Sequence, residues 1–213
     1  MPLMVCETFA SLMGESTRAG VPAYFIRLMG CNLRCRYCDT AYAYEGGHEM
    51  TVAGLVEMAR AQPYRLALVT GGEPLLQAET PVLLTDLLDA GFTVCLETNG
   101  SLPIDTVDAR VHRILDVKCP WSGMADHNDW RNLPLLTSRD EVKFVVADQL
   151  DFTWALEVIK HFQLAGRLPV LISPVFGQVS LQEAAAWILA TRLPVRLNLQ
   201  LHKYIWGTEA RGV

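Results

Sequence analysis

Short apolar strands that alternate with amphipathic helices constrain the fold of this chain more than any other feature. The strand patterns occupy residues 21–28, 66–69, 93–97, 111–117, 141–146, 168–172 and 195–200. Such alternation predicts parallel β/α units, because parallel strands are joined by crossover connections that usually contain a helix. About six or seven such units fall short of the ~250 residues that are typical of a closed eight-stranded barrel. We therefore expect an α/β fold with an incomplete, open parallel barrel of the (β/α)6 type.

Capping signals support this alternation. We expect one helix from Thr51 to about residue 62, and others that begin near Thr80, Asp151 and Ser180. Thr51, Thr80 and Ser180 are predicted N-caps, because a short hydroxyl side chain accepts a hydrogen bond from a free N–H group of the first helical turn. Residues 119–140, by contrast, are predicted to form a loop-rich insert.

Length and composition exclude several classes of protein. At roughly 100–200 residues per domain, 213 residues predict a single domain over residues 1–213. A hydrophobic content of 51% with 19% charged residues excludes a disordered chain. A net charge of −5 argues against nucleic acid as a partner. No apolar run approaches the ~20 residues that span a bilayer, and the N-terminus lacks signal-peptide features, so we expect no membrane association and a cytoplasmic location.

Three cysteines within eight residues give the sharpest chemical signal. Cys31, Cys35 and Cys38 have the spacing C-x3-C-x2-C, directly after a predicted strand. Iron–sulfur clusters are held by cysteine thiolates, normally four, so three cysteines on a 4Fe–4S cluster leave one iron open to a small molecule. Two alternatives are a zinc site with His48 or Cys6 as fourth ligand, and three buried thiols that bind nothing.

Polar motifs follow several of the predicted strands. They include Thr70-Gly71-Gly72-Glu73-Pro74, then Glu97-Thr98-Asn99-Gly100, then Asp116 with Lys118. Ligands of parallel β/α folds bind at the carboxyl ends of the strands, so these motifs predict one large site. The two glycines allow close approach of the backbone to a ligand, and Glu73 with the nearby carbonyl groups is suited to an ammonium group.

The cysteine spacing resembles the signature of the radical S-adenosylmethionine (SAM) superfamily. The 70–74 segment is similar to that superfamily's GGEP motif, and Tyr37 matches the aromatic residue usual between its last two cysteines. The resemblance implies a 4Fe–4S cluster, SAM, radical chemistry that starts at the cluster, and a radical SAM core as the fold. The SAM-binding residues that it implies are Tyr37, Asp39, Gly72, Glu73, Asp116 and Lys118.

Longer segments resemble the 7-carboxy-7-deazaguanine synthase family. These are residues 7–15, 25–28, 38–40, 97–100 and 200–203, and the matches run from residue 7 to about residue 206. Members of that family convert 6-carboxy-5,6,7,8-tetrahydropterin to 7-carboxy-7-deazaguanine with release of ammonia, in queuosine and other 7-deazapurine biosynthesis. The resemblance implies a lyase that needs SAM as a regenerated cofactor and is assisted by Mg²⁺.

The same resemblance assigns roles to individual residues. Thr40 is expected to supply an oxygen to Mg²⁺, Arg27 to bind the carboxylate of the pterin, and Glu15 to bind its guanidine-like edge. The full set of expected substrate-binding residues is Leu12, Met13, Gly14, Glu15, Arg27, Thr70, Glu97, Asn99, Gln200, His202 and Val213. The alternatives are a helix N-cap for Thr40, a salt bridge for Arg27, a solvated loop carboxylate for Glu15 and a structural role for His202. Many members have Gln where this chain has Met13, which we expect to pack on the pterin.

Two other functions are open at this point. A glycyl-radical activating enzyme shares the cysteine spacing and a comparable size, but it acts on a protein backbone and does not need Arg27, Glu15 or Thr40. A non-catalytic iron–sulfur or zinc module is the second. For the synthase, the resemblance implies a flavodoxin- or ferredoxin-like electron donor and a homodimer.

Overall fold

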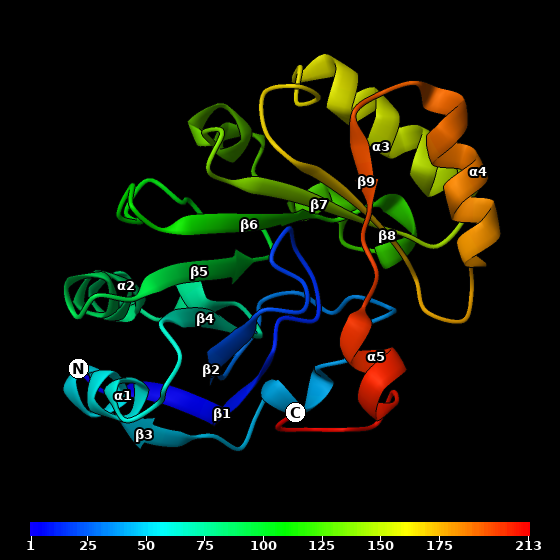
Figure 1. Ribbon diagram of the computed structural model, residues 1–213. Coiled ribbons are helices and arrows are strands. Elements are labelled where there is room, and N and C mark those ends of the chain that lie inside the picture. Colours follow the sequence, from blue (N-terminus) through cyan, green and yellow to red (C-terminus); the bar gives the residue numbers. More distant parts are fainter.

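One curved sheet organises the molecule. The computed structural model describes residues 1–213 and has nine strands in the order β3-β1-β2-β4-β5-β6-β7-β8-β9 (Figure 1). The strands are β1 (Leu3–Leu12), β2 (Pro22–Leu28), β3 (His48–Met50), β4 (Leu66–Gly71), β5 (Thr93–Thr98), β6 (His112–Val117), β7 (Glu141–Val146), β8 (Val170–Pro174) and β9 (Val195–Leu197). From β2 to β9 every neighbouring pair is parallel. Because β3 and β9 lie at opposite edges and do not pair, the open parallel barrel is confirmed.

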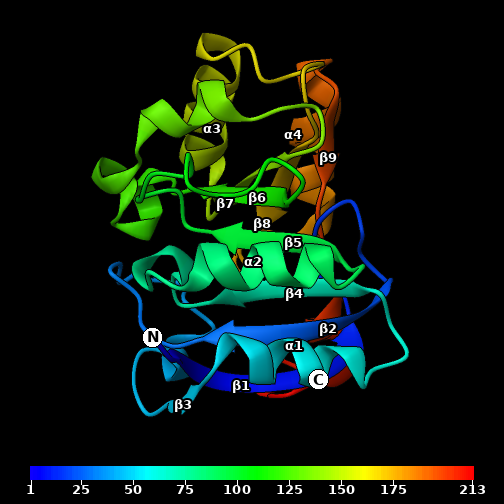
Figure 2. The ribbon, with the colours of Figure 1, turned by 90° about the vertical axis from the view of Figure 1, so that its left-hand side faces the viewer.

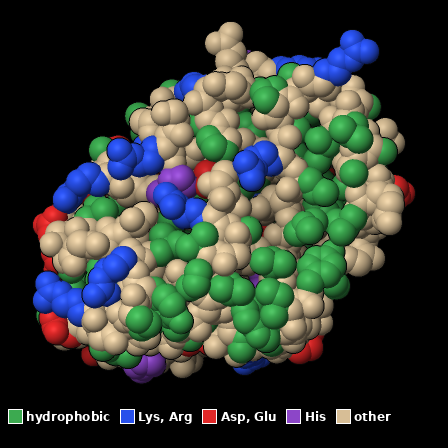
Figure 3. Space-filling view, in the orientation of Figure 1, with side chains coloured by type: hydrophobic (Ala, Val, Ile, Leu, Met, Phe, Trp, Pro, Cys, Tyr) green, Lys and Arg blue, Asp and Glu red, His purple; other side chains and the backbone are tan.

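Helices cover the outer face of this sheet. They are α1 (Val52–Arg60), α2 (Thr80–Asp89), α3 (Gln149–His161) and α4 (Leu181–Thr191), whereas the short α5 (Leu201–Trp206) lines the cavity described below. Figure 2 shows α1 and α2 lying against β1 to β5. In the space-filling view, apolar side chains gather on the right-hand side of the molecule, over α4 and α5 (Figure 3). None of the helices has the length and apolarity that crossing a membrane requires.

The alternation of side chains along β2 separates the core from the barrel interior. Tyr24, Ile26 and Leu28 belong to the large core between sheet and helices. Ala23 and Phe25 point the other way, into a smaller apolar cluster. Successive strand residues face opposite sides of a sheet, so Arg27 also faces the interior. The interior of the barrel is thus apolar at its floor and polar towards the carboxyl ends of the strands.

The predicted helix starts near Thr51, Thr80 and Ser180 are confirmed, whereas the N-cap role of Thr80 and the helix start at Asp151 are wrong. The Thr51 hydroxyl accepts a hydrogen bond from the backbone of α1, and Ser180 forms a capping box at α4. Thr80 is instead the first residue of α2, and its hydroxyl donates to a backbone carbonyl of the preceding turn. The third helix begins two residues before Asp151, because Asp148 caps it by accepting the Asp151 N–H group.

The first strand and the last helix were not predicted. β1 pairs antiparallel with β2, and its polar residues gave no clear strand pattern. The last predicted strand, 195–200, ends at Leu197, and the chain then turns into α5. The 119–140 insert contains only 3-10 helices and loops, as expected: η3 (Pro120–Ser122), η4 (Ala125–His127) and η5 (Trp130–Leu135).

Candidate active site

A cavity of about 440 Å³ opens at the carboxyl ends of the parallel strands. Every site residue expected from the sequence lines it, with Glu73 as the exception. The lining therefore joins the cysteine loop, the β1–β2 loop, the ends of β2, β4, β5 and β6, and the C-terminal segment. Two lining residues with direct roles in the geometry below, Lys143 and Trp121, were not singled out in the sequence.

The cysteine loop is held against the end of β4. The backbone N–H of Glu73 donates to the Gly30 carbonyl over 2.7 Å. A Cβ atom on Gly72 would lie 2.1 Å from that carbonyl oxygen and 2.8 Å from the Cβ of Cys31. Only glycine fits this contact, so the two loops approach as closely as their backbones allow. The Asn99 amide also lies 3.8 Å from the Cys31 sulfur.

The three thiols fit an iron–sulfur cluster better than a single metal ion. Cys31, Cys35 and Cys38 are half-buried and all line the cavity. No group of three or more His, Cys, Asp or Glu side chains is placed to hold one ion. A cubane needs no such convergence, because each cysteine binds a separate iron. His48 and Cys6, the fourth ligands considered for zinc, do not line the cavity.

The environment of Cys35 also suits a cluster. Burial raises the pKa of its thiol, and the nearby Lys118 ammonium opposes that rise. Lys118 lies over the Tyr37 ring at 5.8 Å, and Tyr37 stacks on Trp121 with ring centroids 6.2 Å apart. The thiols therefore share the cavity with an aromatic wall and a cation.

The Glu73 side chain does not reach the cavity, contrary to expectation. It is fully buried, and its carboxylate accepts hydrogen bonds from the Leu75 N–H (3.0 Å), the Thr98 hydroxyl (2.9 Å) and the Asn99 N–H (2.7 Å). Burial raises its pKa, and these hydrogen bonds oppose that rise. Glu73 thus links the turn after β4 to the end of β5. In the segment 70–74, the backbone of Gly71 and Gly72 faces the cavity instead.

A buried lysine gathers three carboxylates at the centre of the cavity. The Lys143 ammonium lies 3.0 Å from Glu15 Oε2, 2.5 Å from Glu97 Oε1 and 3.4 Å from Asp116 Oδ2. Asp116 also pairs with Lys118 at 2.9 Å. Burial disfavours the Lys143 ammonium, but the carboxylates hold its pKa well above the usual value. A lysine inside the otherwise apolar segment 142–146 was the sequence signal for this cluster.

Several polar atoms of this cavity lack a partner. Glu15 Oε1, Asp116 Oδ1 and the Tyr37 hydroxyl are buried without a hydrogen bond. An unsatisfied buried polar group costs roughly 1–3 kcal/mol. Two carboxylate oxygens that lack a donor, and a hydroxyl that lacks any partner, indicate that this cavity suits a polar ligand with hydrogen-bond donors.

Arg27 both forms a salt bridge and lines the cavity. Its Nε donates to Glu7 Oε1 over 2.8 Å, and its guanidinium lies 5.7 Å and 5.8 Å from the ring centroids of Phe9 and Tyr42. The Tyr42 hydroxyl donates to the same Glu7 oxygen. These contacts fix the guanidinium at the end of β2. Arg27 therefore forms the salt bridge expected as the alternative and lines the cavity as well.

The C-terminal segment packs against the cysteine loop. Lys203 pairs with Asp39 at 2.7 Å, and the Gln200 amide and Thr40 hydroxyl also donate to that carboxylate. Burial opposes ionisation of Asp39, but Lys203 outweighs it and lowers the pKa to about 2. The Asp39 carboxylate is thus occupied by contacts with other residues of the chain. The Thr40 hydroxyl makes no N-cap hydrogen bond at the short 3-10 helix η1 (Ala41–Ala43), so the alternative N-cap role is wrong.

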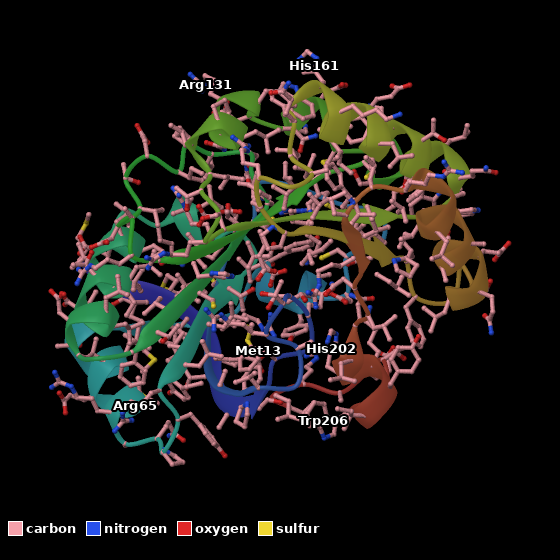
Figure 4. All side chains as sticks on the ribbon, turned by 45° about the horizontal axis from the view of Figure 1, so that its top comes forward. Met13, Arg65, Arg131, His161, His202 and Trp206 are labelled. Carbon is pink, nitrogen blue, oxygen red and sulfur yellow. The ribbon has the colours of Figure 1, made fainter.

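His202 closes the other side of the cavity. A Cβ on Gly14 would lie 2.2 Å from His202 Nδ1, so this contact requires glycine. Burial lowers the pKa of His202, which favours the neutral imidazole. In Figure 4, Met13 and His202 lie near the middle of the molecule and Trp206 at its outer edge. Met13 is buried in the apolar floor, and Val213 lines the mouth of the cavity.

Comparison with known proteins decides the family. The radical SAM superfamily model matches residues 26–185. The 7-carboxy-7-deazaguanine synthase of Chlorobaculum tepidum is 47% identical, with 100% of this chain and 98% of that protein aligned. The synthase of Koribacter versatilis is 38% identical, with 99% and 100% aligned. This chain belongs to the 7-carboxy-7-deazaguanine synthase family.

Solved structures agree with that membership at the level of the fold. The crystal structure of QueE from Escherichia coli superposes on this family member with a TM-score of 0.77 at 22% identity, over 93% of this chain and 94% of that one. SuiB from Streptococcus suis, bound to S-adenosylmethionine, gives a TM-score of 0.59 at 12% identity, over 86% and 52%. The chain is thus a radical SAM enzyme, a class that uses a 4Fe–4S cluster and SAM. The relatives do not favour the glycyl-radical activating alternative.

Proposed function

We propose that this enzyme converts 6-carboxy-5,6,7,8-tetrahydropterin to 7-carboxy-7-deazaguanine and ammonia, a step of queuosine and 7-deazapurine biosynthesis. The observation that carries the proposal is a single cavity in which three thiols lie beside a cluster of buried charges and a fixed arginine. Full-length relatives named for this product support it. A protein substrate would not require a buried cluster of carboxylates.

The cavity contains residues that are suited to bind the 4Fe–4S cluster and SAM. Cys31, Cys35 and Cys38 would hold the cluster, and the glycine backbone after β4 would approach SAM closely. When bound, the cluster and SAM supply one-electron chemistry that removes a hydrogen atom from the substrate. Tyr37 and Lys118 bound the same region and limit the entry of water. Asp39 is proposed to act near SAM through its backbone, since its carboxylate pairs with Lys203.

Mg²⁺ is proposed to bind beside Thr40. Magnesium prefers oxygen ligands and usually keeps waters and substrate atoms in its coordination shell. The Thr40 hydroxyl lines the cavity and donates to Asp39 Oδ1 over 3.0 Å, so an oxygen lone pair stays free towards the cavity. A carboxylated substrate would supply the other oxygen ligands.

The pterin is proposed to lie on the apolar floor of the barrel. Met13 and Phe25 belong to that floor, and Phe9 stacks on Phe25 with centroids 4.8 Å apart. Flat heterocycles pack well on such surfaces. The Arg27 guanidinium is suited to the substrate carboxylate, since its planar fork pairs with carboxylates in a bidentate way. Thr70, Asn99, Gln200, His202 and Val213 complete the polar rim of the proposed site.

Glu15 and Glu97 are proposed to bind the donor-rich edge of the pterin. That edge carries N–H groups, and Glu15 Oε1 is a buried acceptor without a partner. The neutral His202 imidazole adds an acceptor or a donor, according to its tautomer. These contacts would orient the ring so that one carbon faces the cluster side of the cavity. The electron donor is proposed to be a flavodoxin- or ferredoxin-like protein, and the enzyme a single-domain homodimer.

Product identification tests this function. The chain is reconstituted with iron and sulfide under anaerobic conditions, reduced, and incubated with SAM, Mg²⁺ and the carboxypterin. Mass spectrometry should show 7-carboxy-7-deazaguanine, with one ammonia released per product. SAM cleavage with the pterin unchanged would exclude this substrate. A colourless protein that binds one zinc and forms no cluster would exclude the radical SAM site itself.

A further inference from the structure

Lys143 occupies a position that no sequence motif singled out. It lies in the middle of β7, its side chain is 5% exposed, and it contacts carboxylates from three other segments of the chain. Glu15 comes from the β1–β2 loop and Glu97 from the end of β5. An ammonium group that contacts Glu15 and Glu97 as well as Asp116 influences both the separation and the ionisation of the two glutamates.

We propose that Lys143 is a positioning residue for the substrate, which holds Glu15 and Glu97 as a pair of ionised acceptors directed at the donor-rich edge of the pterin. The inference rests on the proposed function. Two carboxylates this close repel each other, and without a cation one of them takes up a proton. A protonated carboxyl group would then present a donor to the donors of the pterin. The lysine therefore shifts both acceptors towards the ionised state that the substrate requires.

The contacts of the two carboxylates favour this role over simple packing. Each uses one oxygen on Lys143. The second oxygen of Glu97 accepts from the Thr70 hydroxyl over 3.1 Å, whereas the second oxygen of Glu15 has no partner. Both oxygens of Glu97 thus have partners, whereas Glu15 Oε1 remains available as an acceptor for a ligand. Removal of Lys143 would free both side chains to turn.

The other charges around Glu15 define its response to pH. Besides Lys143 and Glu97, the charge that acts on it directly is Asp39 in the cysteine loop; His202 packs on the neighbouring Gly14, Lys203 pairs with Asp39, and Asp116 with Lys118 lies beyond Lys143. Burial raises the pKa of Glu15 to about 7, with Lys143 opposing the rise and Glu97 adding to it. Glu15 is therefore ionised above about pH 7 and takes up a proton below it. Without Lys143 that transition moves to higher pH.

The test is the binding of the carboxypterin as a function of pH. Its Kd is measured by anaerobic equilibrium dialysis between pH 5.5 and 8.5 for the wild type, Lys143→Met, Lys143→Arg and the exposed control Lys160→Met. In the wild type, binding weakens as the pH falls below about 7. Lys143→Met should weaken binding roughly a hundredfold at neutral pH and move the transition up by at least about one pH unit. Lys143→Arg should keep the transition near its wild-type pH, because it keeps the charge.

A second variant distinguishes the loss of a titrating group from the loss of the folded structure. Glu15→Gln cannot titrate, so the transition near pH 7 should disappear, whereas cluster absorbance and thermal unfolding report that the protein is intact. A Lys143→Met variant with the wild-type transition, or a Glu15→Gln variant that keeps it, would overturn the inference. A wild-type chain that binds the pterin with this pH dependence but forms no product would overturn the proposed function alone.

Discussion

The cysteine loop and the Lys143 charge cluster form two walls of one cavity, yet they are assembled in opposite ways. The three cysteines lie within eight consecutive residues, so their proximity follows directly from the sequence. The charge cluster takes Glu15, Glu97, Asp116 and Lys143 from a loop and three strands, over 129 positions of the chain. The difference teaches that local order places the proposed cofactor ligands, whereas the sheet assembles the proposed substrate site.

The difference extends to their energetics. Each cysteine contributes a thiol that is half-buried and makes few contacts of its own. Lys143 and its carboxylates are buried and interdependent, and removal of one member of such a group leaves uncompensated charge. We therefore expect changes in the loop to affect the cofactor and leave the fold intact. Changes in the cluster should affect substrate binding and its pH dependence.

Cys35→Ala should have the largest effect. Loss of one of three ligands prevents formation of the cluster, so the visible absorbance after reconstitution and all SAM cleavage should disappear, a loss of about 10³-fold or more. The control is Cys95→Ala, which alters a buried thiol at the apolar floor. That variant should keep the cluster. Retained SAM cleavage in Cys35→Ala would contradict the ligand assignment.

Gly72→Ala should come next. Its Cβ would lie 2.1 Å from the Gly30 carbonyl oxygen, so the cysteine loop must move away from β4. Misplacement by about 1 Å can cost roughly a hundredfold in rate. Gly91→Ala is the control, since that glycine has nothing within 4 Å, and its positive φ means that an alanine there strains only the local backbone. Equal turnover in the two variants would show that the contact between the loops does not matter.

Thr40→Ala should reduce turnover about tenfold and flatten its response to Mg²⁺. The cluster absorbance should stay unchanged, because Thr40 lies outside the cysteine set. Steady-state rates against Mg²⁺ concentration provide the measurement. If the variant responds to magnesium as the wild type does, Thr40 is not part of the metal site.

Lys203→Met should have the smallest effect, about fivefold on KM, because ion pairs of this partly exposed kind contribute up to about 1 kcal/mol. The pair lowers the pKa of Asp39 to about 2. A lowered carboxyl pKa stabilises the folded state above the unfolded value, so this contact persists down to about pH 4 and is lost between about pH 4 and pH 2. Limited proteolysis of residues 200–213 at pH 7 should be faster in the variant. An unchanged cleavage rate would mean that other contacts hold the segment.

Much of the site was predictable, and the exceptions have physical causes. Glu73 sits in a motif that points to the cavity, but the burial that the turn imposes makes its carboxylate bind Thr98 and Asn99 instead. Lys143 was missed because a single lysine in an apolar strand has no spacing that marks it. Gln200 and His202 were expected at a strand end, and they lie at the start of α5 because β9 stops at Leu197.

The sequence by itself determined the open parallel β/α architecture, the cysteine spacing and the family, because periodicity and local spacing are properties of neighbouring residues. Tertiary structure alone decided which carboxylates meet Lys143, that Asp39 pairs with Lys203, and that β1 extends the sheet antiparallel. These contacts join residues far apart along the chain. Their partners are selected by which strands become neighbours and by the cost of leaving a buried charge unpaired.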